Sequence, residues 1–173
     1  MGKFLLGIIF TLIVVIGGGY WWVSTGHVDS RAVPNGPSPF ERRTANHAVD
    51  EWVDAHAPKQ ENPFQPTTEN LLAGQKIYDD NCAWCHGSLK QPVSPMKTKF
   101  FPPVPQLMTR TPDDPDANFF YVTKYGIKLS GMPGWDGIIT DDDIWKAVLF
   151  IKNSSKLKDA PAQAPATTPA PAK

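Results

Sequence analysis

The sequence predicts an all-α protein in which an apolar N-terminal helix precedes one small helical domain. The first 25 residues contain a long apolar run, and later segments begin with helix-capping residues and repeat apolar side chains at helical spacing. No alternating strand pattern flanks the cysteine motif of this 173-residue chain. Once the terminal and linking segments are set aside, about 90 residues remain, which suits a single domain.

The first 25 residues predict a membrane anchor. Residues 4–23 as a helix would span about 30 Å, the thickness of the hydrocarbon core of a bilayer. Tyr20, Trp21 and Trp22 at the end of this run suit the membrane–water interface. The alternative is a cleaved signal peptide, but no Ala-x-Ala-like cleavage site follows. We therefore expect residues 1–25 to be an uncleaved anchor that contacts the lipid bilayer through residues 4–23.

Residues 26–66 are expected to form a linker with one amphipathic helix at about residues 39–57. A capping box with proline at the first helical position opens this helix at Ser38, and Pro58 ends it. The predicted inward face consists of Ala45, Ala48, Val49, Trp52 and His56. The helix either docks the anchor to the following domain or to a partner, or it is a solvated helix that packs one Trp onto the nearest surface.

The domain itself is expected to cover residues 67–158 and to begin with a threonine-capped helix over residues 69–80. Gly74, Tyr78 and Cys82 follow at intervals of four, so they share the face of this helix that leads to the cysteine motif. A glycine in a helix interior costs about 1 kcal/mol relative to alanine, which suggests that close packing against another helix requires Gly74.

Two further helices complete the predicted domain. One begins at Asp114-Pro115, with a capping Asp and with Pro at the first helical position, and ends at Gly126. The last begins after the capping residue Thr140 and should cross the first helix. Residues 159–173 are rich in Ala, Pro and Thr, which predicts a flexible tail with nothing to bury.

The two cysteines of the chain lie in the run Cys82-Ala-Trp-Cys85-His86. A Cys-x-x-Cys-His run is the attachment signature of c-type haem. On one helical turn the three side chains share a face, so both thiols can form thioethers to one macrocycle while the imidazole ligates its iron. A redox disulfide would be expected in a βαβ context. A structural zinc site needs four ligands, whereas this run supplies three.

Two later segments suit a haem site. Residues 87–110 are rich in proline and show no periodicity, and a loop of this length is unusual in a small domain unless it wraps something. In Gly131-Met132-Pro133, the proline disfavours a helical residue before it and the glycine allows close approach. A Met thioether is a known ligand of haem iron. Met132 is therefore the candidate sixth ligand, with Met96 and Met108 as competitors.

Together these motifs resemble those of class I cytochromes c, here carried on a membrane anchor. The resemblance covers residues 67–158 and implies the class I cytochrome c fold, in which short helices pack around one covalently bound haem c. It implies that Cys82 and Cys85 attach the haem and that His86 and Met132 are the two ligands of its iron.

The resemblance also implies contacts around these ligands. A proline carbonyl in the loop would accept a hydrogen bond from the second nitrogen of the His86 imidazole. Pro105 is the first candidate, and Pro102 and Pro103 are the alternatives. Trp135 could donate its indole N–H to a haem propionate, with a place in the hydrophobic core as the equal alternative.

With two axial ligands the iron has no open position for a substrate, so we expect one-electron transfer and not an enzyme. The partners would be membrane redox complexes or other cytochromes, with no small-molecule substrate. The 17 basic and 17 acidic residues give no sign of the basic surface that binds nucleic acid. In the resembling family haem is attached outside the cytoplasmic membrane. This implies a single-pass protein of a bacterial cytoplasmic (inner) membrane with its haem domain in the periplasm.

Two other functions stay open at this point. The chain could be a fixed haem-bearing subunit of a larger membrane oxidoreductase complex, with its linker and tail as assembly contacts. It could also be a haem protein that binds gases or performs peroxidase-like chemistry, if Met132 does not ligate the iron.

Overall fold

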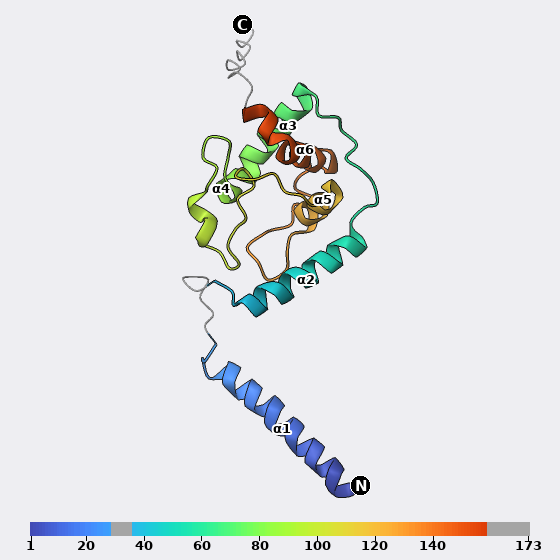
Figure 1. Cartoon of the computed structure of the whole chain (residues 1–173), viewed down its shortest axis with the longest axis vertical. Coiled ribbons are helices and arrows are strands. Elements are labelled where there is room, and N and C mark those ends of the chain that lie inside the picture. Colours follow the sequence, from blue (N-terminus) through green and yellow to red (C-terminus); the bar gives the residue numbers. More distant parts are fainter. Residues whose placement is uncertain (29–35, 159–173) are drawn as a thin grey trace. The chain divides into compact units, whose positions relative to one another are not determined.

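The computed structural model describes residues 1–28 and 36–158, and the regular structure in these ranges is entirely helical (Figure 1). The elements are α1 (Gly2–Ser24), α2 (Pro39–His56), α3 (Thr68–Asn81), α4 (Ala83–His86), the 3₁₀ helix η1 (Pro95–Thr98), α5 (Asp116–Tyr125) and α6 (Asp141–Lys158). The predicted all-α class is therefore confirmed. The chain divides into two compact units, residues 1–31 and 32–173, which are described separately. The predicted tail, residues 159–173, lies outside the described residues.

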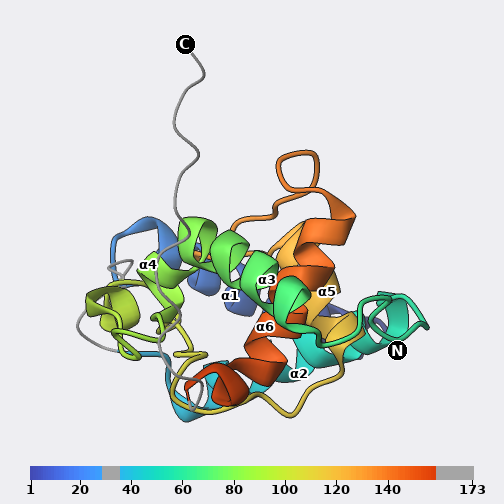
Figure 2. The same cartoon turned by 90° about the horizontal axis from the view of Figure 1, so that it is seen from above.

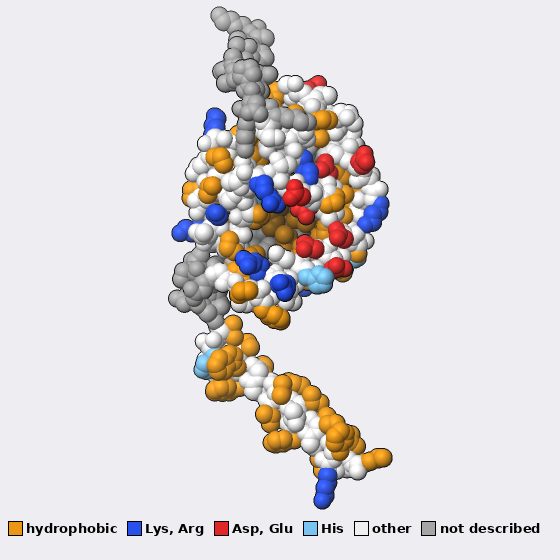
Figure 3. Space-filling model, in the orientation of Figure 1, with side chains coloured by type: hydrophobic (Ala, Val, Ile, Leu, Met, Phe, Trp, Pro, Cys, Tyr) orange, Lys and Arg blue, Asp and Glu red, His pale blue; other side chains and the backbone are white. Residues whose placement is uncertain are grey.

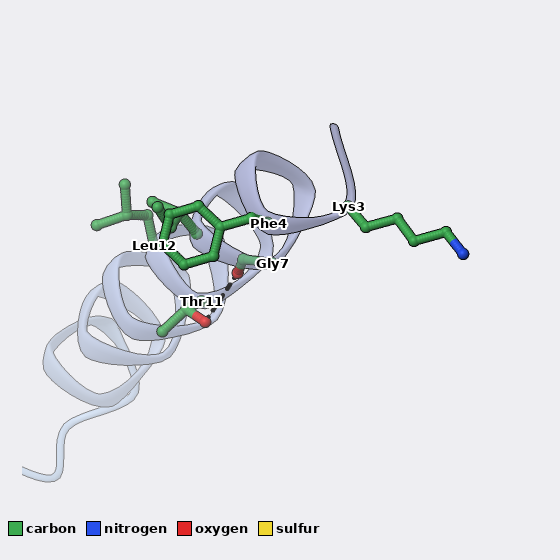
Figure 4. Close-up of a pocket in the computed structure, with 6 residues that line it drawn as sticks. Lys3, Phe4, Gly7, Thr11 and Leu12 are labelled. Carbon is green, nitrogen blue, oxygen red and sulfur yellow. Dashed lines mark hydrogen bonds between the residues drawn. The ribbon is translucent and has the colours of Figure 1, made fainter. Parts of the chain in front are cut away.

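The first unit contains α1, and every side chain of this helix is exposed. Its length and composition are sufficient to cross a membrane, and they also fit a signal sequence near an N-terminus. Two threonine hydroxyls are satisfied by carbonyls of the helix. Thr11 donates its hydroxyl to the Gly7 carbonyl at 2.9 Å (Figure 4), and Thr25 donates to the Trp21 carbonyl at 2.7 Å where the helix ends. Such internal bonds are what a hydroxyl needs in an apolar environment.

In the second unit, α2 begins with the predicted capping box. The Ser38 backbone N–H donates to the Glu41 carboxylate at 2.8 Å, and the Glu41 backbone N–H donates to the Ser38 hydroxyl at 3.2 Å. These two bonds satisfy backbone donors that the first turn of a helix otherwise leaves unpaired.

The face of α2 that is buried differs from the predicted one. Val53 and Ala57 are buried and Val49 is half-buried, whereas Trp52 remains 59% exposed. Trp52 lies at the edge of this contact, where its indole N–H donates to the Tyr121 hydroxyl of α5 at 3.1 Å. A Trp with a polar N–H suits the rim of a contact better than its centre. The helix therefore packs on α5 through small apolar residues, one position away from the expected stripe.

The core of the second unit is organised around the crossing of α3 and α6, which both views show (Figures 1 and 2). At the crossing, a Cβ added to Gly74 would lie 2.0 Å from the Lys146 carbonyl oxygen. Only glycine permits such an approach of two backbones. Next to it the Tyr78 ring lies 5.3 Å from the Phe150 ring, and both side chains are fully buried.

A second group of buried residues joins α5, α6 and α2. The rings of Phe120 and Trp145 stack at 4.3 Å, and Val53 of α2 belongs to the same cluster. α5 itself begins at Asp116, one residue later than predicted, with Pro115 as its N-cap and no side chain capping the helix. As predicted, the Thr140 hydroxyl accepts from the Asp143 backbone N–H, at 3.2 Å, in the first turn of α6.

Candidate functional site

The Cys-x-x-Cys-His run forms a tight turn of helix directly after α3. Cys82 is both the C-cap of α3 and the N-cap of α4, and its backbone N–H donates to the Tyr78 carbonyl at 2.8 Å. The His86 backbone N–H donates to the Cys82 carbonyl at 2.9 Å, which closes one helical turn. Cys82, Cys85 and His86 are all half-buried. Cys82, Cys85 and His86 therefore lie on one turn of helix.

Two residues hold this turn in place. The buried Tyr78 donates its hydroxyl to the Gly87 carbonyl at 2.7 Å, which joins α3 to the end of α4. Burial raises the pKa of Tyr78, so the hydroxyl keeps its proton for this bond. Gly87 has a φ of +81°, and a Cβ there would lie 2.3 Å from the Pro92 carbonyl oxygen. A side chain at this position would therefore push the following loop away from α4.

The two thiols are free and are not joined in a disulfide. Burial raises the pKa of Cys82 to about 12, with further contributions from Cys85 and Asp79, and burial also raises the pKa of Cys85. Both side chains are therefore neutral thiols at neutral pH. Redox-active cysteines have lowered pKa values instead, and neither cysteine of this turn has one.

The imidazole of His86 is oriented by the loop that follows α4. Its Nδ1 donates to the Pro105 carbonyl oxygen at 2.9 Å, and the Leu107 backbone N–H donates to the His86 carbonyl at 3.1 Å. Because a carbonyl can only accept, Nδ1 carries the proton and Nε2 has a free lone pair. Burial lowers the pKa of His86, and the bond to Pro105 opposes this effect. A neutral imidazole with an available Nε2 is the form that ligates metals.

The loop itself is held by two polar residues that the sequence analysis missed, Gln106 and Ser94. The side chain of Gln106 bonds to three backbone groups, and the buried hydroxyl of Ser94 donates to the Trp84 carbonyl. Neither residue belongs to a recognisable motif, and their partners are distant in sequence. Both residues lie within the proline-rich loop of residues 87–110, and no pattern in the sequence connects them to α4.

Met132 lies in a loop between α5 and α6 that comes near His86. Two glycines shape this loop. A Cβ on Gly126 would lie 2.8 Å from the Met132 carbonyl oxygen, and one on Gly131 would lie 2.3 Å from the Phe100 ring. The Met132 backbone N–H donates to the Ser130 hydroxyl at 3.1 Å. Met132 itself is half-buried. Because the backbone of its loop is closely packed at Gly126 and Gly131, the position of the Met132 side chain is restricted.

The competing methionines occupy different environments. Met108 is fully buried in the cluster that contains Tyr78 and Phe150, which is a core position. Met96 is half-buried in η1. Trp135 is half-buried and packs against the cluster of Phe120 and Trp145, the core position that was one of its two expected roles.

The residues that come together fit a covalently attached haem. Two free thiols lie one helical turn apart, next to an imidazole with an available Nε2, and a thioether lies in a nearby loop. Figure 3 shows a hollow near the middle of the visible face of the second unit, with hydrophobic side chains inside it and charged side chains around it. Over residues 1–28 and 36–158, Cys, His, Asp and Glu side chains do not gather in groups of three or more that could hold a metal ion directly.

Comparisons with known proteins identify a related family. Residues 69–151, which run from the first turn of α3 into α6, match the family model described as "Cytochrome C oxidase, cbb3-type, subunit III". Among solved structures, the chain is similar to one from the Kuenenia stuttgartiensis reducing HAO-like protein complex, with 20% sequence identity and a TM-score of 0.44. The similarity covers 70% of the present chain and 66% of the other, just under two thirds of its length. No curated protein matches.

Proposed function

Residues 69–151 form a cytochrome c domain, and from this premise we propose that the chain is a one-electron carrier with a single haem c. Cys82 and Cys85 would attach the haem, and His86 and Met132 would ligate its iron. The observation that carries the proposal is the state of His86. Its Nδ1 is committed to the Pro105 carbonyl at 2.9 Å, which leaves Nε2 as the ligating atom on the same helical turn as both thiols.

A bound haem c supplies a site that cycles between ferrous and ferric iron. The protein determines which reactions this site can support. If His86 and Met132 both ligated the iron, no position would remain for a substrate, and electron transfer would not require one. As a ligand, the Met132 thioether would favour the ferrous state, whereas the bond from His86 to Pro105 would make the imidazole a stronger donor. The proposed carrier is therefore not an enzyme.

We further propose that α1 is retained as a membrane anchor and that the haem domain lies in the periplasm. The support is the length of α1 and its fully exposed apolar surface, which would be stable in lipid and not in water. An anchor would confine the carrier near the bilayer and raise its effective concentration toward redox partners in the membrane. Those partners would be quinol-oxidising complexes, oxidases or other cytochromes.

A direct test is to produce the full chain in a host that attaches haem c and to purify it from membranes in detergent. The proposal expects haem that stays bound after denaturation, a reversible one-electron transition, and no binding of carbon monoxide by the reduced protein. A Cys82→Ala, Cys85→Ala double variant should lose the covalent haem. Rapid binding of carbon monoxide by the wild type would instead indicate an open ligand position, as in a gas-binding or peroxidatic haem protein. Recovery only in the soluble fraction, with α1 removed, would identify α1 as a signal peptide.

The family description supports a second candidate, since it names a subunit of an oxidase. In this version the chain is a fixed haem-bearing subunit of a larger membrane complex. Size-exclusion chromatography in mild detergent distinguishes the two candidates. A free carrier elutes as a monomer, and a fixed subunit elutes with stoichiometric partner chains.

A further inference from the structure

The side chain of Gln106 connects three backbone groups that are far apart in sequence. Its Nε2 donates to the Cys85 carbonyl at 3.1 Å and to the Val104 carbonyl at 3.0 Å, and its Oε1 accepts from the Ser94 backbone N–H at 2.6 Å. One amide therefore uses both of its donor hydrogens and its acceptor on the backbone. These bonds fix α4 and two parts of the following loop to the same point.

Ser94 adds a second link between the loop and α4. Its hydroxyl donates to the Trp84 carbonyl and accepts from the Met96 backbone N–H at 3.0 Å. Ser94 is only 4% exposed, so these bonds are shielded from water. The loop thus satisfies the carbonyls of two adjacent residues in the Cys-x-x-Cys-His turn, Trp84 and Cys85.

Gln106 directly follows Pro105, whose carbonyl accepts the bond from His86 Nδ1 at 2.9 Å. The Pro105 carbonyl and the Gln106 backbone N–H belong to one planar peptide unit. Fixing the Gln106 side chain to α4 therefore restricts both the distance and the orientation of that carbonyl relative to the imidazole, which is itself carried by α4.

We propose that Gln106 is a positioning residue that sets the strength of the His86–Pro105 hydrogen bond and, through it, the reduction potential of the haem. The proposal rests on the proposed ligation of haem iron by His86. A stronger bond from Nδ1–H makes the imidazole a better donor and stabilises ferric iron, which lowers the potential. Releasing the Pro105 carbonyl should weaken this bond and raise the potential.

The test is Gln106→Met, which keeps the length of the side chain and removes all three of its bonds. The matched control is Gln91→Met, in the same loop, where the exposed side chain contributes to none of these bonds. In the haem-loaded full chain, Gln106→Met should shift the one-electron equilibrium toward the ferrous state by threefold or more. That shift corresponds to roughly 30 mV at 59 mV per tenfold change. The exchange of the His86 Nδ1 proton with solvent, followed by NMR, should become tenfold faster or more. The control should change neither quantity.

A potential and an exchange rate equal to those of the wild type in Gln106→Met would overturn the proposal, even if the variant were less stable. If the variant fails to retain haem, a measurement on the wild type tests the proposal. The Nε2 protons of Gln106 must exchange slowly in the haem-loaded protein, and free exchange would also overturn the proposal. Failure of the proposed function looks different, because the wild type would then lack covalent haem or a reversible one-electron transition.

Discussion

The substitution Gly74→Ala tests the geometry of the crossing between α3 and α6. The added Cβ would lie 2.0 Å from the Lys146 carbonyl oxygen and 3.1 Å from the Phe150 Cβ, whereas real Cβ atoms essentially never come within 3.0 Å of another atom. The obstacle at 2.0 Å is backbone, which cannot rotate away as a flexible side chain can. The two helices would have to separate by about 1 Å, and close-packed interiors resist such a movement.

The size of the effect follows from two opposing contributions. Over-packing a core costs roughly 1–3 kcal/mol and occasionally more, and Ala in a helix is about 1 kcal/mol better than Gly. Because the clash involves backbone, we expect the upper end of the first range or beyond it. The net loss in the free energy of unfolding should be about 2 kcal/mol. For a domain of about 90 residues, this loss lowers Tm by roughly 8–16 °C.

Thermal and urea unfolding of the haem-loaded chain, followed by haem absorbance, measure this loss. Gly36→Ala is the matched control, because nothing lies within 4 Å of a Cβ added at Gly36. The control should leave Tm within a degree or two of the wild type. A Gly74→Ala variant as stable as the control would refute the close crossing described here.

Three further substitutions test the site and its supports. Met132→Ala should lower the reduction potential and allow carbon monoxide to bind the reduced haem. Met96→Ala should do neither. An absorption spectrum of Met132→Ala equal to that of the wild type would show that Met132 is not a ligand of the iron. Tyr78→Phe removes the buried bond to the Gly87 carbonyl and should lower the free energy of unfolding by about 1–2 kcal/mol. Tyr125→Phe, at an exposed tyrosine, should have no effect. Equal losses in the two variants would contradict the role of the Tyr78 hydroxyl. Lys124→Met removes bonds of 2.8 and 2.9 Å to the Asp141 carboxylate and should cost about 1 kcal/mol or less, measured by urea unfolding. The hydrogen bond to Asp141 raises the pKa of Lys124. The ion pair therefore contributes its full stability at pH values below the ordinary pKa of lysine, and this stability is lost as the pH rises through the raised pKa. A difference in the free energy of unfolding between wild type and variant that persisted at higher pH would argue against this ion pair.

Local signals predicted much of the fold because they are local in the structure too. The capping box at Ser38 and the cap at Thr140 satisfy backbone donors within one turn, so these bonds depend only on residues that are close in sequence. The crossing at Gly74 was predictable because an unfavourable residue in a helix implies a packing reason. The inward face of α2 was predicted correctly at Val49 and wrongly at the other positions. Trp52 is the largest apolar side chain there, yet its indole N–H finds the Tyr121 hydroxyl at the rim, and the smaller Val53 is buried.

The cysteine turn was equally accessible to sequence reasoning, since its three residues need only one helical turn to converge. The side chains that support this turn could not be predicted from the sequence. Gln106 reaches the Cys85 carbonyl across 21 positions, and the Ser94 hydroxyl reaches the Trp84 carbonyl across 10. No periodicity or composition signals a bond between a loop side chain and a distant backbone group. The roles of Met132 and Trp135 toward a haem remain predictions, and Met132→Ala tests the first of them.

The crossing of α3 and α6 joins segments from opposite ends of the domain sequence, and this affects the order of maturation. Because the chain is synthesised from its N-terminus, the cysteine turn is complete before α6, the helix that packs against α3. Cys82 packs against a cluster that includes Phe150 and Ile151 of α6, so its thiol is less covered until α6 has packed onto α3. A haem-free chain truncated before Asp141 should accordingly react with iodoacetamide faster than the full haem-free chain, and equal rates would contradict this. In this topology, α6, the last of the described helices, completes the burial of Cys82 in the cysteine turn that was formed earlier in the chain.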